Sequence, residues 1–280
     1  MKTPVKAPIR LCICGVGGRM GARILAAVRA EGDLAVTGAT ERPQGPQVGQ
    51  DAGLVAGLSR IDVQVAPALD AALGPPGAAP AADVVIDFTA PAASLEHAAV
   101  CARRGVALVV GTTGFSPREK EELAAHAKKI AILLAPNMSV GVNVLFRLVA
   151  EAARALGAQY DCEIVELHHR AKKDAPSGTA LRLAEVAAAA LRLDAANALV
   201  YERHGDVGAR KPGTIGVQTL RGGDAVGDHT VFFLADGERL ELTHRATSRD
   251  NFARGAVRGA RFVAFRAPGL YDMQDVLGLS

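Results

Sequence analysis

The stretch Ile9-Arg10-Leu11-Cys12-Ile13-Cys14-Gly15-Val16-Gly17-Gly18-Arg19-Met20-Gly21 decides the fold class of this chain. Ile9–Cys14 is largely apolar and predicts a strand, and a helix is predicted over residues 22–31. A glycine-rich loop between a strand and a helix lets backbone amides approach a pyrophosphate, whose charge the helix N-terminus favours. The match to G-x-G-x-x-G is imperfect, because Met20 takes the place of the third glycine and Gly21 follows one residue later. Ordinary turn glycines are therefore the alternative.

Beyond this loop, predicted strands and helices alternate through the first half of the chain. The helix after Ser116 has the clearest start, with Pro117 at its first position and Glu119 three residues after the cap. Repeated strand–helix units predict an α/β fold with a Rossmann-type, doubly wound parallel sheet. The carboxyl ends of its strands then share one rim, where ligands bind. Further strands are predicted at residues 34–39, 63–66, 84–88, 107–110 and 130–134.

After Ser139 the pattern changes, which predicts a second α+β domain with a mixed or antiparallel sheet. The turn Arg221-Gly222-Gly223-Asp224 favours a hairpin between the extended segments on either side. A final apolar helix, residues 251–264, is expected to return to the first domain. We therefore expect residues 1–138 with 250–280 to form a dinucleotide-binding domain and residues 139–249 a substrate-binding one. The second domain is predicted to contain helices at 142–156 and 177–193 and strands at 161–169, 214–220, 230–234 and 239–244.

Composition narrows the class of protein. The 280 residues carry 32 basic and 29 acidic side chains, a net charge of +3 that is too weak to indicate nucleic acid as a partner. No stretch approaches the roughly 18 apolar residues of a membrane span, so no membrane partner is expected. Cys12 and Cys14 lack the second pair that a zinc site needs, and buried reduced thiols in a cytoplasmic protein without a metal are the prediction.

Residues at the ends of later strands extend the predicted cofactor site. Glu41 lies 20 residues past Gly21, where a carboxylate can accept hydrogen bonds from the adenosine ribose. The neighbouring Arg42 can hold a 2′-phosphate, so the pair predicts use of both NADH and NADPH. A solvated charge pair is the alternative. Residues 111–113 and 135–138 follow two further strands and are expected near the nicotinamide and its ribose, although they can also be plain tight turns.

The most informative stretch is His168-His169-Arg170-Ala171-Lys172-Lys173-Asp174-Ala175-Pro176-Ser177-Gly178-Thr179. Ser177 opens a helix whose first amides Gly178 leaves accessible, which with the helix dipole predicts a carboxylate site. The cations beside it indicate a ligand with more than one negative charge, and His168 or Lys172 can donate a proton to a substrate that receives a hydride. A basic surface loop beside an ordinary helix cap is the alternative. A two-histidine metal site is disfavoured because adjacent strand residues point to opposite faces.

These motifs resemble those of the 4-hydroxy-tetrahydrodipicolinate reductase family, long called dihydrodipicolinate reductases, of bacterial lysine and diaminopimelate biosynthesis. The resemblance runs nearly end to end, and its most specific element is His-His-x-x-Lys-x-Asp-Ala-Pro-Ser-Gly-Thr, beginning at His168. The glycine loop alone is far less specific. The other shared stretches are residues 15–21, 49–53, 87–89, 111–115, 135–143, 166–172, 174–180, 221–224, 243–246 and 270–275.

The resemblance implies an oxidoreductase that reduces a cyclic dicarboxylic imine with NADH or NADPH. The 4-hydroxyl leaves as water and a hydride arrives at the same ring carbon. By motif, His168 is the proton donor or acceptor and Lys172 a proton donor, while His169, Gly178 and Thr179 bind the substrate carboxylates. A homotetramer assembled through the sheet of the second domain is also implied. The implied cofactor residues are Gly15, Val16, Gly17, Gly18, Arg19, Met20, Glu41, Arg42, Gly111, Thr112, Thr113, Ala135, Pro136, Asn137 and Met138.

Two other functions remain open at this point. A semialdehyde dehydrogenase on a similar two-domain plan needs an activated cysteine, but Cys162 lies inside a predicted strand and is expected to pack in the core. A non-catalytic NAD-binding regulator would keep the glycine loop but not the cluster of His168, Lys172 and Thr179. Which of His168 and Lys172 delivers the essential proton is also open.

Overall fold

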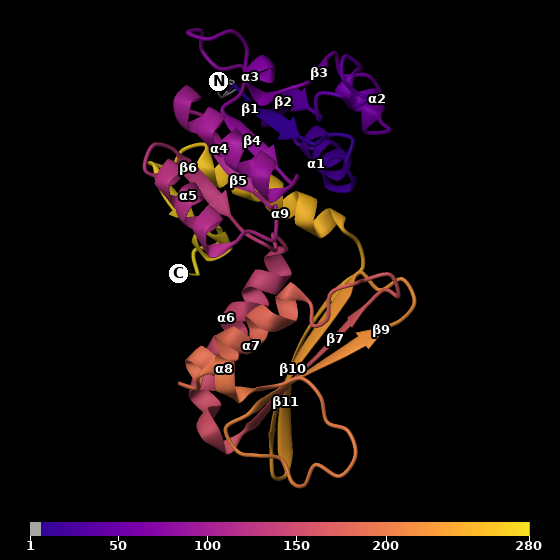
Figure 1. Cartoon of the computed structure of the whole chain (residues 1–280), viewed down its shortest axis with the longest axis vertical. Coiled ribbons are helices and arrows are strands. Elements are labelled where there is room, and N and C mark those ends of the chain that lie inside the picture. Colours follow the sequence, from indigo (N-terminus) through magenta and orange to yellow (C-terminus); the bar gives the residue numbers. More distant parts are fainter. Residues whose placement is uncertain (1–6, 280) are drawn as a thin grey trace, which may run out of the picture. The chain divides into compact units, whose positions relative to one another are not determined.

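The computed structural model describes residues 7–279 and divides the chain between two compact units (Figure 1). The first unit contains the residues up to Met138 and those from Asp250 onward, so the C-terminal segment returns to it. The second unit is the continuous segment Ser139–Arg249.

A seven-stranded parallel sheet forms the centre of the first unit. Its strands are β1 (Ile9–Cys14), β2 (Leu34–Thr40), β3 (Val65–Ala66), β4 (Val84–Asp87), β5 (Ala107–Val110), β6 (Ala131–Leu134) and β12 (Gly269–Tyr271). Their order is β12-β6-β5-β4-β1-β2-β3, and each neighbouring pair runs parallel. The first six strands have the usual dinucleotide-binding order, in which ligands bind where the order reverses, between β1 and β4. The predicted Rossmann-type sheet is confirmed, with β12 as an additional strand.

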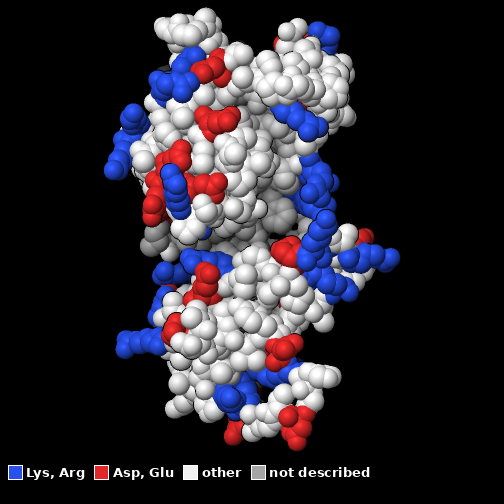
Figure 2. Space-filling model, in the orientation of Figure 1, with Lys and Arg blue, Asp and Glu red and all other residues white. Residues whose placement is uncertain are grey.

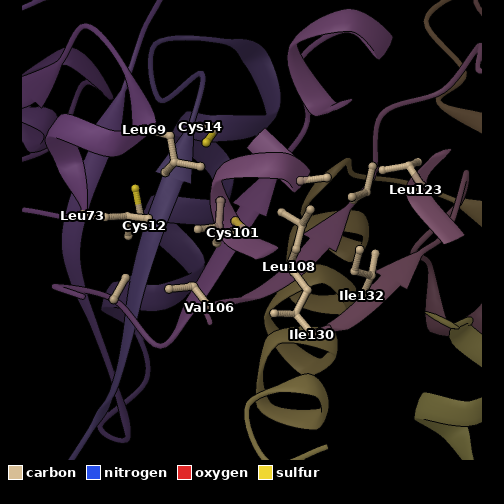
Figure 3. Packing of buried hydrophobic residues seen from close by; sticks show 14 of the residues in the cluster. Cys12, Cys14, Leu69, Leu73, Cys101, Val106, Leu108, Leu123, Ile130 and Ile132 are labelled. Atoms are coloured by element: carbon tan, nitrogen blue, oxygen red, sulfur yellow. The ribbon is translucent and has the colours of Figure 1, made fainter. Parts of the chain in front are cut away.

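Helices cover both faces of this sheet. The long helices α1 (Arg19–Arg29) and α9 (Asp250–Val263) pack together on one face, and α4 (Pro91–Arg104) and α5 (Pro117–Ala127) cover the other. Short helices α2 (Ala52–Val55), α3 (Leu69–Ala72) and α10 (Met273–Leu277) complete the unit. Figure 3 shows the core beneath α4 and α5, where the thiols of Cys12, Cys14 and Cys101 lie among leucine, isoleucine and valine side chains. All four cysteines are buried and free, as predicted.

Two helix starts show how local sequence acts in this unit. At α5 the predicted capping box is confirmed: Ser116 Oγ accepts from the amide of Glu119 at 3.3 Å, and the Glu119 carboxylate accepts from the amide of Ser116 at 2.6 Å. At α1 the helix begins three residues earlier than predicted, at Arg19. Gly21 therefore lies inside the first helical turn rather than before it.

The second unit pairs two helices with a five-stranded sheet. Helices α6 (Val140–Leu156) and α7 (Gly178–Ala190) lie side by side on one face of the sheet, with the short α8 (Ala195–Ala198) after them (Figure 1). The strands are β7 (Asp161–His168), β8 (Leu199–Val200), β9 (Ile215–Arg221), β10 (Gly227–Ala235) and β11 (Glu238–Ala246). Their order is β11-β10-β7-β9-β8, with β7, β8 and β9 parallel and β10 and β11 antiparallel, so the sheet is mixed, as predicted.

The predicted hairpin at Arg221-Gly222-Gly223-Asp224 is wrong. Strand β7 lies between β9 and β10, so the chain after β9 crosses the end of β7 instead of pairing back on itself. The hairpin of this sheet joins β10 to β11. Turn residues in a sequence indicate only that the chain reverses direction, whereas the pairing of strands depends on which side chains become buried. Every second residue of β7 is buried, which places this strand at the centre of the sheet.

None of the helices between residues 7 and 279 is long and apolar enough to cross a membrane. Over the same residues, no group of three or more His, Cys, Asp and Glu side chains is arranged to hold a metal ion.

Candidate active site

The glycine loop of the first unit is fixed to the end of β2. The amides of Gly15 and Val16 both donate to the carbonyl of Thr40, at 2.9 and 3.2 Å. Gly15 has a φ of +69°, which favours glycine, and a Cβ on Gly21 would lie only 2.1 Å from the carbonyl oxygen of Gly15. Glycine at both positions therefore allows α1 to begin directly against the loop. No side chain caps α1 at Gly18, so its first amides face the loop in the arrangement that binds phosphate.

Glu41 lies against this loop, where the sequence predicted a ribose-binding carboxylate. Its Oε1 accepts a hydrogen bond of 2.8 Å from the amide of Gly17. Arg42 beside it and Arg19 at the start of α1 are both exposed. Backbone amides, a helix N-terminus, a carboxylate and two exposed cations thus surround one loop. This donor set fits a nicotinamide dinucleotide.

The other predicted cofactor residues follow β5 and β6 on the same rim of the parallel sheet. Thr112 is buried, and its Oγ1 accepts from the amide of Thr89 at 3.0 Å and bonds the hydroxyl of Ser94 at 2.8 Å. It therefore ties the loops after β4 and β5 together, whereas Thr113 is exposed. A Cβ on Gly111 would meet the ring of Phe88 at 2.2 Å, so glycine is required there. Ala135, Pro136, Asn137 and Met138 follow β6 directly.

A buried ion pair beneath the rim was missed by the sequence analysis. Asp87 is fully buried at the end of β4; its Oδ1 accepts from the amide and hydroxyl of Thr89, and its Oδ2 accepts from Nδ1 of His97 at 2.8 Å. Burial lowers the pKa of His97, but hydrogen bonds to Asp87 and Cys14 outweigh it and raise that pKa to about 10. The pair anchors α4 to β4 and holds Thr89 beside the glycine loop.

In the second unit, the alternation of β7 turns Glu166 and His168 toward the helices. Glu166 is fully buried, and its Oε2 accepts from Nδ1 of His168 at 2.5 Å. Arg221 donates to both oxygens of the same carboxylate, at 2.7 and 3.0 Å. Burial raises the pKa of Glu166, but hydrogen bonds from His168 and Arg221 outweigh it and lower that pKa to about 2. The carboxylate is therefore ionised at neutral pH.

The start of α7 is tied to the same carboxylate. The amide of Ser177 donates to Oε1 of Glu166 at 2.9 Å. The hydroxyl of Ser177 accepts from the amide of Ala180 and forms a hydrogen bond of 3.1 Å with Nε2 of His229. Burial lowers the pKa of His229 to about 3, so this ring is neutral. A Cβ on Gly178 would meet nothing within 4 Å. Folding therefore does not demand glycine there, and the first turn of α7 is open to an incoming anion.

The remaining predicted residues of this half lie in the loop between β7 and α7. Lys172 donates to Oδ1 of Asp174 at 2.9 Å, so Lys172 and His168 have separate carboxylate partners. Nη2 of Arg249 lies 3.4 Å from Nε2 of His169. Figure 2 shows basic side chains gathered where β7 and β9 of Figure 1 run into their loops.

Sequence reasoning missed Glu166 and Arg221 as site residues. A carboxylate two residues before His168 on a strand shares its face, and this spacing was the available signal. Arg221 had no such signal, because its place beside Glu166 depends on the parallel pairing of β9 with β7. The loop after β9 then closes over the end of β7, with the amide of Gly222 donating to the carbonyl of His168 at 3.0 Å.

Cys162 is not a candidate nucleophile. The residue is 1% exposed inside β7, and burial raises the pKa of its thiol to about 12. A thiol that stays protonated at neutral pH is a poor nucleophile. This environment disfavours the thiol-dependent dehydrogenase chemistry considered above.

Comparisons with known proteins match one family along almost the whole chain. The family model described as dihydrodipicolinate reductase, N-terminus, matches residues 9–138, and that described as dihydrodipicolinate reductase, C-terminus, matches residues 141–277. A 4-hydroxy-tetrahydrodipicolinate reductase of Myxococcus xanthus is 58% identical over 270 residues, covering 96% of this chain and 98% of its own. A protein of the same name from Anaeromyxobacter dehalogenans is 56% identical with the same coverage.

A solved structure shows the same fold. The dipicolinate-bound dihydrodipicolinate reductase of Paenisporosarcina sp. TG-14 superposes with a TM-score of 0.75 at 23% identity. The match covers 96% of this chain and 98% of that one.

Proposed function

Because this chain belongs to the dihydrodipicolinate reductase family, we propose that its first unit holds NADH or NADPH and its second unit holds the cyclic dicarboxylate to be reduced. The chain is an oxidoreductase of lysine and diaminopimelate biosynthesis. It reduces (2S,4S)-4-hydroxy-2,3,4,5-tetrahydrodipicolinate to (S)-2,3,4,5-tetrahydrodipicolinate. One proton is consumed as the 4-hydroxyl leaves as water, and the same carbon gains a hydride.

The observation that carries the substrate half is the open first turn of α7 beside a histidine held by a buried carboxylate. We assign the binding of the substrate carboxylates to Gly178 and Thr179 in that turn and to His169, which Arg249 flanks. Amides at a helix N-terminus and neighbouring cations are suited to carboxylates. The solved relative from Paenisporosarcina was obtained with dipicolinate, a ring with two carboxylates. This ligand has the same chemistry as the proposed substrate.

The proton transfer is assigned to His168 and Lys172. Glu166 holds a proton on Nδ1 of His168, which leaves Nε2 as the nitrogen that exchanges a proton with the substrate. Lys172 is positioned by Asp174 in the same loop, where its ammonium group can donate to the reacting dicarboxylate. General acid catalysis of this kind typically contributes about 10²–10⁴-fold to a rate.

The cofactor half consists of the fifteen residues that follow β1, β2, β5 and β6. When bound, the reduced nicotinamide supplies the hydride. The loop Gly15–Gly18 lets the pyrophosphate approach the start of α1, where the amides of Arg19 and Met20 bind it. Glu41 accepts from the ribose hydroxyls, and Arg42 holds a 2′-phosphate when one is present. The remaining residues, near the nicotinamide, are Gly111, Thr112, Thr113, Ala135, Pro136, Asn137 and Met138. Dual use of NADH and NADPH follows from having Glu41 and Arg42 side by side.

We also propose a homotetramer that assembles through the outer face of the second unit's sheet. On the face opposite α6 and α7, the side chains of Val165, Leu167, Phe232 and Leu234 are only half-buried, and Leu220, paired with Leu167, is 51% exposed. Copies of this chain that pair these faces would remove the apolar surface from water. The four free cysteines suit a reducing compartment, so we place the enzyme in the cytoplasm.

The direct test of the function is oxidation of NADH and of NADPH, followed by absorbance. The substrate is generated in situ by condensing pyruvate with aspartate semialdehyde, using the preceding enzyme of the pathway. We expect turnover with each cofactor that depends on both precursors. A folded protein that binds NADH but turns over neither cofactor would instead be a regulator.

A single substitution tests the cofactor assignment. We expect Arg42→Ala to weaken NADPH by about 10–100-fold and NADH by much less, because only NADPH loses a charge-assisted bond to its 2′-phosphate. Dissociation constants from fluorescence titration measure the difference. Arg103→Ala, at an exposed position paired with Asp70 at the far end of α4, serves as the control. Equal losses of both cofactors in Arg42→Ala would show that Arg42 does not hold the 2′-phosphate.

A further inference from the structure

We infer that Glu166 is a positioning residue for the reaction: its carboxylate orients His168 for proton transfer and sets the start of α7 relative to that ring. The inference deepens the proposed function and rests on the role of His168 in it. Glu166 itself is fully buried and does not reach the substrate. It acts through the groups that it binds, which are His168, Ser177, Thr219 and Arg221.

The first step concerns the tautomer of His168. An ionised carboxylate can only accept hydrogen bonds, so the contact of 2.5 Å between Oε2 of Glu166 and Nδ1 of His168 requires a proton on Nδ1. The neutral ring then has an unprotonated Nε2, the nitrogen that gains and loses the exchangeable proton. Gly227 borders this nitrogen, since a Cβ there would lie 2.8 Å from Nε2. A larger residue at 227 would push the ring out of place.

The second step concerns the other oxygen of the same carboxylate. Oε1 accepts from the amide of Ser177, the N-cap of α7, at 2.9 Å and from the hydroxyl of Thr219 at 3.3 Å. The proton-transfer ring and the turn that binds the substrate carboxylates are thus held by two oxygens of one rigid group. Proton transfer is sensitive to errors of about 1 Å in such placements. Glu166 therefore links the position of the substrate to that of the ring.

The third step concerns charge. Arg221 donates to both oxygens of Glu166 and also to the carbonyl of Asp174, and it balances the buried negative charge. The other titratable and charged groups around His168 are His229, whose ring lies edge-on at 5.2 Å, and the pair of Lys172 with Asp174. The negative charge of Glu166 thus lies against the His168 ring, and the positive charge of Arg221 offsets it. Removing the charge of Glu166 and removing the charge of Arg221 should therefore shift the pH dependence of kcat in opposite directions.

The experiment compares kcat, KM and the pH profile of the tetrahydrodipicolinate reduction in wild type and Glu166→Gln. We expect kcat to fall at least about tenfold and the substrate KM to change by less than about threefold, because Ser177 still caps α7. The decline of kcat with rising pH should begin at lower pH, since Glu166→Gln removes the negative charge that contacts the His168 ring. A second variant, Arg221→Met, should move that decline to higher pH.

Glu163→Gln is the matched control. Glu163 lies on the same strand, three residues away and on the opposite face, and it also pairs with two arginines, Arg203 and Arg210. Its loss should leave kcat and the pH profile unchanged. An independent readout is the ¹⁵N spectrum of histidine-labelled wild type, in which neutral His168 should carry its proton on Nδ1.

Three results would overturn the inference. One is a wild-type kcat and pH profile in Glu166→Gln, and another is neutral His168 protonated on Nε2. The third is an equal loss of kcat in Glu166→Gln and Glu163→Gln together with a lower Tm, which would show a purely structural role. Failure of the proposed function looks different, because then His168→Gln itself would retain activity or wild type would show no turnover.

Discussion

Replacing His168 with glutamine lowers kcat by about 10²–10⁴-fold, the usual contribution of a general acid. Glutamine keeps much of the ring's volume and can still hydrogen-bond Glu166, but it cannot exchange a proton at the position of Nε2. The dissociation constant for NADH should stay the same, because His168 and the glycine loop belong to different units. Steady-state kinetics on the in situ substrate, with a separate NADH titration, measure both quantities.

The comparison variant for this prediction is Lys172→Ala, which tests whether His168 or Lys172 delivers the essential proton. If Lys172 is a donor, its loss lowers kcat strongly with cofactor affinity nearly unchanged. If it mainly binds the dicarboxylate, the substrate KM rises and kcat is kept. A normal kcat in His168→Gln combined with a strong loss in Lys172→Ala would move the proton transfer from the histidine to the lysine.

Gly21→Ala should destabilise the first unit and weaken cofactor binding together. The added Cβ would lie 2.1 Å from the carbonyl oxygen of Gly15 and 2.7 Å from Cα of Val16, and backbone atoms cannot rotate away as a side chain can. Overpacking of this kind costs typically about 1–3 kcal/mol, and we expect the upper end. The corresponding fall in Tm is about 5–10 °C. NADH affinity should fall at least about tenfold, because α1 must move off the pyrophosphate loop.

Gly32→Ala is the control for this substitution, since a Cβ on Gly32 would meet nothing within 4 Å and Gly32 is not among the glycines with positive φ. Calorimetry and NADH titration of both variants give the comparison. A Gly21→Ala protein with the Tm and NADH affinity of wild type would show that α1 does not begin as close to the loop as the structure indicates.

The fold of the first unit could be predicted because its signals are local. The first βα unit consists of a strand, a glycine loop and a helix that follow one another directly in the sequence. Every later βα unit repeats the same hydrophobic periodicity. Right-handed crossovers leave few ways to connect such units, so the parallel sheet followed. The strand β12 escaped prediction because its three residues, Gly269–Tyr271, are too short for any period to show.

In the second unit the elements were predictable but their pairing was not. The sequence places a turn after β9, and the chain does reverse there, yet β7 comes between β9 and β10. Pairing depends on which strand buries its face most fully, which is a property of the assembled unit. The same insertion of β7 brings Arg221 beside Glu166, so the missed Arg221 and the wrong hairpin have one cause.

The sequence by itself therefore determined the kinds of chemistry that this protein carries: a phosphate-binding glycine loop, a ribose-binding carboxylate, and a histidine and lysines before an open helix start. These features are local, because each needs only residue types at short spacing. Only the tertiary structure decided how that chemistry is held, with Glu166 shared among His168, Ser177 and Arg221. A buried carboxylate is stable only when strands and a helix from distant parts of the sequence supply its partners, and no local pattern records where they meet.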